Sequence, residues 1–301
     1  MNRKLVVATR RSALALAQTR AFVARLCELE PSLQVSELQV TTQGDRVLDR
    51  SLAEIGGKGL FVKELEQALL DREADFAVHS MKDLPAELAE GLVLGCVPLR
   101  EDPRDVLIGQ TAATLTALPR GAKVGSSSLR RAIQIRLERP DLEVLPLRGN
   151  VDTRIRRLRE GVVDAIMLAH AGLRRLGLAA EVTELLSPER CLPAVGQGAL
   201  GIECRGSDSE LLERLARLTD AETLLAVSAE RALLRAVDGN CQVPVAAYAD
   251  RMGAELRLRG LLAEPDGSLL RRVDQRVPWP TDVAAAVALG TQLGVRLREK
   301  P

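Results

Sequence analysis

Aromatic side chains make up only 2% of the 301 residues, and the sequence contains two histidines. Proteins that bind single-stranded nucleic acid stack bases on aromatic rings and carry a clear excess of positive charge. The formal net charge is +1 at pH 7, so the composition disfavours a general nucleic-acid binder. Two histidines also leave little material for a histidine-based metal site, and we expect no metal.

Long apolar runs are absent as well. The first residues, MNRKLVVATRR, hold four consecutive apolar positions between charges, too few for the core of a signal peptide. No later stretch approaches the length of a membrane span. We therefore expect a soluble cytoplasmic protein that does not act at a membrane.

The cysteines form an odd set without a CxxC pair, which argues against a disulfide framework and a zinc ribbon. Most of them sit among apolar residues and are interpreted as small buried side chains: Cys27, Cys96, Cys191 and Cys204. Cys241 differs, because Asn240 and Gln242 beside it are polar and favour a turn near solvent. For an isolated cysteine of this kind, a structural role is still the default interpretation.

Arginine outnumbers lysine by 36 to 6, and residues 120–159 hold eleven basic and four acidic residues. Guanidinium groups bind carboxylates and phosphates through two parallel hydrogen bonds. This segment is therefore predicted to bind anions. A nucleic-acid binder that uses residues 120–159 remains an alternative explanation of the same charge.

Short apolar strands alternate with helices along most of the chain. "LVVAT" precedes a helix that Ser12 is placed to cap, and "VSELQVTTQ" and "ADFAVHS" are further buried-strand patterns. After "PLREDPRD" the alternation resumes, from "KVGSSSLRRAIQIRLE" to "DAIMLAHAGLRRLG". This order predicts largely parallel sheets with helices on both faces.

The carboxyl-terminal part has a different pattern: a long helix from Ala221, the turn with Cys241, two alternating strands and a last helix over residues 282–297. A Pro-Asp-Gly turn at residues 265–267 joins the two strands. The predicted fold class is α/β, with two α/β domains and a small C-terminal α+β domain. The predicted boundaries are 1–98 plus 199–216 for the discontinuous first domain, 99–198 for the second and 217–301 for the third.

Arginines recur just after the strand patterns, at the sheet edge where open α/β folds bind ligands. Arg10 follows the first strand, and Arg130 and Arg131 follow the serines at residues 126–128, which are placed to cap a helix. The same edge is predicted for Arg148, Arg154, Arg174 and Arg175, and solvated surface charges for Arg156, Arg157 and Arg159. Such a set suits a ligand with several carboxylates. The segment "GGKGLF" lacks the spacing of a phosphate-binding loop.

Lys82 and Asp83 follow the strand "ADFAVHS" in the turn "MKDLP". They are interpreted either as an exposed ion pair of little energetic value or as a functional pair. In the functional case, Asp83 is an ionised carboxylate in a cationic cleft that stabilises a developing positive charge. His79 is expected to pack in the core, and nothing singles out His170 as a base.

A series of motifs appears in a fixed order along nearly the whole chain. They are "ATRRSALA", "TTQGDRVLD", "IGGKGLFVKELE", "AVHSMKDLP", "REDPRD", "GSSSLRRAIQ", "LRGNVDTR", "LAHAGLRRLG", "LPAVGQGALGIECR" and "GNCQVPV". With these motifs the sequence closely resembles the porphobilinogen deaminase family, also called hydroxymethylbilane synthase. Each motif is weak alone, whereas the set at these spacings is highly specific.

The resemblance implies an enzyme of tetrapyrrole (heme) biosynthesis that condenses four porphobilinogen molecules head to tail, with loss of ammonia, into hydroxymethylbilane. It implies two domains like periplasmic binding proteins with the active-site cleft between them, and a third domain that carries a cysteine loop. It also implies a dipyrromethane cofactor held by a thioether bond to Cys241. A monomer without nucleic acid or metal is expected.

The resemblance also implies roles for individual residues. Asp83 would hold pyrrole nitrogens and stabilise the cation formed when ammonia leaves. Besides Cys241 and Asp83, the cofactor would be held by Lys82, Ser128, Arg130 and Arg131. Substrate carboxylates would be bound by Arg10, Ser12, Arg148, Arg154 and Arg175. Lys58 and Phe61 would belong to a loop that covers the site.

This sequence departs from the usual family pattern at Ala13, Asn240 and Ala246, none of which is a reacting group. A non-catalytic binding protein for an anionic ligand remains the main alternative, because its first two domains would look alike. Cys241 and Asp83 distinguish the two possibilities, since a binding protein has no need of a thiol that carries a cofactor.

Overall fold

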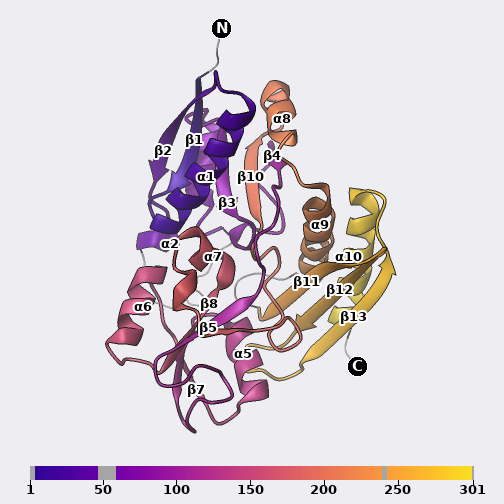
Figure 1. Cartoon of the computed structure of the whole chain (residues 1–301). Coiled ribbons are helices and arrows are strands. Elements are labelled where there is room, and N and C mark those ends of the chain that lie inside the picture. Colours follow the sequence, from indigo (N-terminus) through magenta and orange to yellow (C-terminus); the bar gives the residue numbers. More distant parts are fainter. Residues whose placement is uncertain (1–3, 47–58, 239–242, 300–301) are drawn as a thin grey trace. The chain divides into compact units, whose positions relative to one another are not determined.

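A computed structural model describes residues 4–46, 59–238 and 243–299 (Figure 1). The chain divides into two compact units. Of the described residues, unit 1 contains 4–46, 59–101 and 199–224, and unit 2 contains 102–198, 225–238 and 243–299. The predicted division into three domains at residues 98, 198 and 216 stays a prediction.

Unit 1 is built on a sheet with the strand order β2-β1-β3-β10-β4. Its strands are β1 (Lys4–Arg10), β2 (Gln34–Val40), β3 (Phe76–Ser80), β4 (Leu92–Cys96) and β10 (Leu200–Arg205). Its helical segments are α1 (Ala13–Leu29), α2 (Gln43–Arg46), α4 (Lys63–Leu70), the 3-10 turn η1 (Met81–Asp83) and α8 (Ser209–Ala216). The segment after residue 198 thus supplies an inner strand to the sheet that the first residues form.

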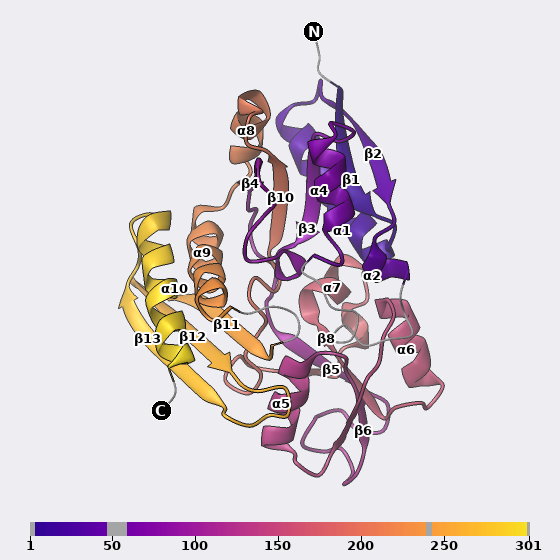
Figure 2. The same ribbon diagram turned by 180° about the vertical axis from the view of Figure 1, so that it is seen from behind.

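The two faces of this sheet bury different side chains because successive residues of a strand point to opposite sides. Leu5 and Val7 of β1 pack with Phe22 of α1 and with α8, whereas Ala8 packs with Leu65 and its neighbours in α4. Helices α1 and α8 therefore cover one face and α4 the other, as the views from the two sides show (Figure 2).

Unit 2 contains a second sheet with the order β7-β6-β8-β5-β9. Its strands are β5 (Asp105–Gly109), β6 (Lys123–Gly125), β7 (Glu143–Leu145), β8 (Ala165–Ala169) and β9 (Glu184–Leu185). Helix α5 (Leu129–Glu138) packs on one face, and α6 (Val151–Arg159) and α7 (His170–Arg175) on the other. The short 3-10 segment η2 (Ala179–Glu181) follows α7.

The remaining part of unit 2 is an antiparallel meander, β11 (Val245–Met252), β12 (Glu255–Leu262) and β13 (Arg271–Pro278). Helices α9 (Ala221–Ala236), whose first residues belong to unit 1, and α10 (Val283–Arg298) supply the apolar side chains that pack on this sheet. The predicted last helix and the hairpin at residues 265–267 are confirmed, and so is the fold class of two α/β regions with a small α+β region.

The expectation of largely parallel sheets is wrong in part. β10 runs antiparallel to both β3 and β4, and β5 runs antiparallel to both β8 and β9. Parallel strands that follow each other in the chain are joined by a crossover connection, usually a helix. β10 has no such connection to β3 or β4, because residues 102–198, which precede it in the chain, belong to unit 2. Apolar periodicity reveals that a strand is buried, but it carries no information on the strand's direction.

Within the described residues, no helix combines the length and the apolar character needed to cross a membrane. The same residues contain no group of three or more His, Cys, Asp and Glu side chains arranged to hold a metal ion.

The contact between α9 and α10 depends on glycine. A Cβ atom at Gly290 would overlap the carbonyl oxygen of Ala229, and one at Gly294 would lie 2.6 Å from the Cβ of Ala236. Gly290→Ala should therefore lower the free energy of unfolding by about 1–3 kcal/mol, although alanine favours an isolated helix. Denaturant unfolding measures the change. Gln292→Ala on the exposed side of α10 is the control, and equal stability of both variants would contradict this packing.

Candidate active site

The turn after β3 holds the predicted catalytic carboxylate of unit 1. The backbone N–H of Met81 donates to the carbonyl of Ala199 at 3.0 Å, and Met81 itself is buried. The side-chain amide of Gln18 in α1 exchanges hydrogen bonds with the Ser80 hydroxyl at 3.0 and 3.2 Å. These contacts fix the backbone on which Asp83 is half-buried.

Arg10, Ser12 and Phe61 lie in the same unit. Arg10 ends β1, which runs parallel to β3, so Arg10 and Asp83 both come from the carboxyl edge of one sheet. The Arg10 guanidinium lies over the Phe61 ring, 4.3 Å from its centroid. The Ser12 hydroxyl accepts a hydrogen bond from the backbone N–H of Ala15 and caps α1, as predicted.

In unit 2, Arg148 lies in the turn before α6, and Arg154 lies in the first turn of that helix. Gly149 has φ +111°, which disfavours residues with a Cβ, and its carbonyl accepts from Nε of Arg154 at 2.8 Å. Burial, together with the positive charges of Arg131 and Arg148, lowers the pKa of Arg154 to about 10. Guanidinium groups gathered so closely favour a bound anion, because an anion relieves their repulsion.

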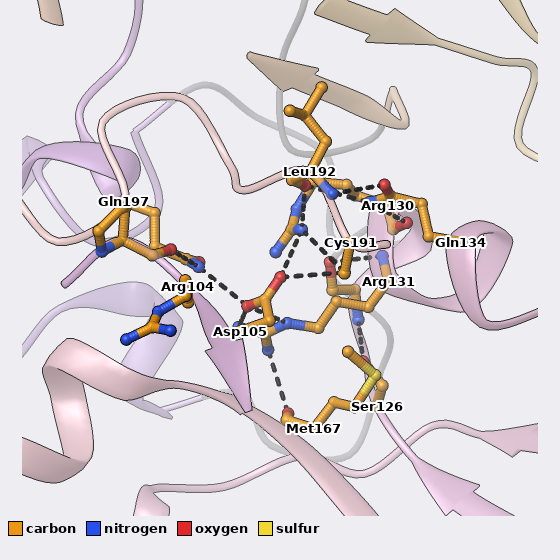
Figure 3. A network of polar contacts seen from close by, with 12 residues as sticks. Arg104, Asp105, Ser126, Arg130, Arg131, Gln134, Met167, Cys191, Leu192 and Gln197 are labelled. Atoms are coloured by element: carbon orange, nitrogen blue, oxygen red, sulfur yellow. Dashed lines mark hydrogen bonds and ion pairs between the residues drawn. The ribbon is translucent and has the colours of Figure 1, made fainter. Parts of the chain in front are cut away.

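Arg130 and Arg131 lie in the first turn of α5 and contact a carboxylate that the sequence pattern did not reveal. Nη1 of Arg130 donates to Oδ2 of Asp105 at 2.6 Å, and Nε and Nη2 of Arg131 donate to Oδ1 at 3.0 and 2.8 Å. Gln197 also donates to Oδ1, and the Cys191 thiol to Oδ2 (Figure 3). We call Asp105, Arg130 and Arg131 the buried ion cluster, because Asp105 is wholly buried and both arginines nearly so.

The charges in the buried ion cluster stabilise one another. Burial alone raises the pKa of the Asp105 carboxyl, but the charges of Arg130 and Arg131 outweigh burial and hold the pKa well below its usual value. Further hydrogen bonds orient the arginines: Arg130 donates to the carbonyl of Leu192 at 2.7 Å and Arg131 to that of Met167 at 3.2 Å. The predicted cap is present as well, since the Ser128 hydroxyl accepts from the backbone N–H of Arg131.

Arg175, the last predicted arginine, lies in α7 of unit 2. Its Nη2 donates to the carbonyl of Gly198 at 2.6 Å, and Arg174 beside it is exposed. His170 begins the same helix, and its Nδ1 lies 3.0 Å from Oδ2 of Asp102. His79 of unit 1 is buried with Nε2 3.0 Å from Oε2 of Glu203, which confirms the expected core position.

Comparison with known proteins identifies the family. The description "Porphobilinogen deaminase, dipyromethane cofactor binding domain" matches residues 5–213, and "Porphobilinogen deaminase, C-terminal domain" matches residues 224–299. The chain belongs to the porphobilinogen deaminase family. A porphobilinogen deaminase of Sorangium cellulosum is 60% identical over 299 residues, covering 99% of this chain and 100% of the relative. One of Bacillus subtilis is 53% identical over 272 residues, covering 90% of this chain and 87% of the relative.

The solved structures that match this chain do so at much lower identity. A probable amino-acid ABC transporter extracellular-binding protein of Bacillus subtilis has a TM-score of 0.46 at 10% identity, and the match covers 71% of this chain and 89% of that chain. The family assignment therefore rests on the sequence matches. They confirm the predicted enzyme, its formation of hydroxymethylbilane in tetrapyrrole biosynthesis, and its dipyrromethane cofactor.

The donor set of unit 2 fits the cofactor of porphobilinogen deaminases. Dipyrromethane carries acetate and propionate groups, and burial together with the positive charges of Arg131 and Arg148 lowers the pKa of Arg154. Of the residues predicted to hold or cover this group, Lys58 and Cys241 lie outside the described residues, and so does Asn240, one of the departures from the family pattern. Lys82 is exposed on its turn.

Two departures from the family pattern fall within the described structure. Ala13 begins α1 without the usual proline, and the Ser12 cap forms nonetheless. Ala246 is buried in β11 and packs with Leu192 and Leu261. Of the cysteines interpreted as small core side chains, Cys96, Cys191 and Cys204 are buried, whereas Cys27 is only partly so.

Loss of the side-chain charge should affect the free energy of unfolding differently at Arg131 and at Arg154. In a Cys241→Ser background, which the family resemblance predicts to lack the cofactor, Arg154→Met removes a desolvated, repelled charge and should change the free energy of unfolding by less than about 1 kcal/mol or raise it. Arg131→Met removes a partner of buried Asp105 and should cost about 3 kcal/mol or more. Denaturant unfolding at pH 7 compares the two variants, and equal losses would contradict the assigned electrostatics.

Proposed function

We propose that this chain performs the reaction of its family with Asp83 as the catalytic carboxylate and a set of arginines as the carboxylate-binding groups. Arg131, Arg148 and Arg154 carry the second part of this proposal, because burial and the charges of the other two arginines lower the pKa of Arg154 and a porphobilinogen chain presents many carboxylates. The matching position in the motif "MKDLP" and the fixed turn after β3 support the first part.

Each condensation breaks the bond between the aminomethyl carbon of porphobilinogen and its protonated nitrogen, which leaves with the electron pair as ammonia. The remaining cation is joined to a pyrrole carbon, which then loses its proton. The ionised Asp83 carboxylate would accept hydrogen bonds from the pyrrole N–H groups and stabilise this positive charge. When bound, dipyrromethane supplies the pyrrole carbon to which the first substrate is attached.

The arginines would bind rather than react. Arg10, Arg148, Arg154 and Arg175, with Ser12, would hold the acetate and propionate groups of the substrate. Lys82, Ser128, Arg130 and Arg131 would hold those of the cofactor. Because guanidinium groups bind carboxylates equally before and during the reaction, their loss should raise KM more than it lowers kcat. Phe61 is proposed to cover the site together with Lys58.

We also propose that the chain acts as a monomer in the cytoplasm and does not bind nucleic acid. Several arginines of the basic segment 120–159 support the last point, because they are engaged by carboxylates within the fold. Arg130 and Arg131 pair with Asp105, and Arg139 pairs with Asp141 at 2.6 Å. The cysteines Cys27, Cys96, Cys191 and Cys204 are free thiols, which suits a reducing compartment.

Asp83→Asn should lower kcat at least about 100-fold, because an amide cannot offset the charge of the cation. Porphobilinogen turnover by purified protein measures the loss, and circular dichroism checks that the fold is retained. Glu87→Gln removes an exposed carboxylate of the same loop and should leave turnover unchanged. Wild-type turnover by Asp83→Asn would disprove the assigned role.

Cys241 is proposed as the thioether anchor of the cofactor. The parent protein, purified from cells, should show an intact mass raised by one dipyrromethane group. Cys241→Ser should lack both the increment and activity, whereas Cys27→Ser, at a half-buried free thiol, should keep both. An unmodified but fully active Cys241→Ser protein would rule out this anchor.

A further inference from the structure

Asp105 is the last residue of the motif "REDPRD", but the proposed reaction gives its carboxylate no role. It is the first residue of β5 and is 0% exposed. Its carboxylate accepts hydrogen bonds from groups widely separated in the sequence: Arg130, Arg131, Cys191 and Gln197. A buried carboxylate so fully engaged orients its partners rather than reacting with a ligand.

The arginines that Asp105 engages are neighbours in the first turn of α5, and both side chains are buried. Two adjacent buried guanidinium groups repel each other unless a negative charge lies between them. Asp105 places one oxygen on each arginine, so the buried ion cluster has a net charge of +1 rather than +2. Each guanidinium is thereby fixed in direction as well as partly neutralised.

The charge of Arg131 also acts on the arginines proposed to bind substrate. Arg131 contributes to the lowered pKa of Arg154, so its charge acts on the same positive cluster. Nε and Nη2 of Arg131 are held by Asp105, and its Nη1 by the carbonyl of Met167. The place of the Arg131 charge relative to Arg154 is therefore set by Asp105.

We propose that Asp105 is a positioning residue for cofactor uptake, which holds Arg130 and Arg131 in the orientation that receives the carboxylates of dipyrromethane. This inference rests on the proposed function, in which these arginines hold the cofactor. Gln197 assists, because its amide donates both to Asp105 at 2.9 Å and to the carbonyl of Pro103 at 2.7 Å. Neither side chain takes part in bond making or breaking.

Asp105→Asn keeps the size of the side chain and removes its charge. After expression in cells, the fraction of chains that carry the dipyrromethane mass increment should fall at least fivefold relative to the parent. The loaded chains should show KM for porphobilinogen raised at least fivefold, with kcat per loaded chain within about twofold of the parent, as expected for lost ground-state binding. Full loading with the parent KM would overturn the proposal.

A matched control separates positioning from stability. Gly290→Ala weakens the packing of α9 against α10 without touching the buried ion cluster, so it should lose stability and keep full cofactor loading. Asp141→Asn removes the carboxylate of another Asp–Arg pair of unit 2 and should also load fully. Equal loss of loading in Gly290→Ala and Asp105→Asn at matched stability would overturn the proposal, because loading would then follow stability alone.

A second variant decides the matter if Asp105→Asn does not fold. Gln197→Met removes one donor to Asp105 and leaves both ion pairs in place, so it should fold, load at least twofold less cofactor and show a raised KM. Parent loading and KM in a folded Gln197→Met protein would then overturn the proposal. A parent protein that carries no mass increment would instead disprove the proposed function, and with it this inference.

Discussion

The pairing of one buried carboxylate with two buried guanidinium groups is the constraint on which the α/β part of unit 2 depends. Asp105 begins β5, while Arg130 and Arg131 lie in the first turn of α5, on one face of the same sheet. An unpaired charge in this position would cost several kcal/mol. The strand β5, the helix α5 and residues 191–198 are consequently fixed to one another by charge and hydrogen bonds as well as by apolar packing. The two arginines therefore cannot turn freely toward solvent.

The buried ion cluster also offsets part of the repulsion among the arginines of unit 2 while leaving a net positive charge. Around Arg131 the positive charges outnumber the single carboxylate, and burial with this repulsion lowers the pKa of Arg154 to about 10. Below pH 10 the folded state carries the full penalty of a charged Arg154. Between about pH 10 and the ordinary value of 12.5, the folded state loses its proton before the unfolded chain, so the penalty falls as the pH rises. At neutral pH, carboxylates of a ligand would relieve the same repulsion.

Local signals in the sequence were sufficient for the caps, the last helix and the hairpin, because each depends on residues only a few positions apart. Ser12 and Ser128 cap their helices as expected. Strand direction was not predictable, since β10 joins the sheet of unit 1 from a distant part of the chain. The partner of Arg130 and Arg131 was not predictable either, because Asp105 lies 25 residues before Arg130, in the motif "REDPRD". The available signal was two adjacent arginines on a helix whose other residues are largely apolar, which implies a buried counter-charge.

Unit 2 also shows how the elements that flank Cys241 are held. Glu230 of α9 is buried and accepts hydrogen bonds from the backbone N–H of Gly196 at 2.7 Å and from that of Ala249 in β11 at 2.9 Å. The helix before Cys241 and the strand after it are therefore tied to each other and to residues 191–198. The same residues 191–198 supply partners to the buried ion cluster. Residues 191–198 thus hold both the arginines proposed to receive the cofactor and the elements α9 and β11, which flank Cys241 in the sequence. A change in residues 191–198 would therefore disturb carboxylate binding and cofactor attachment together.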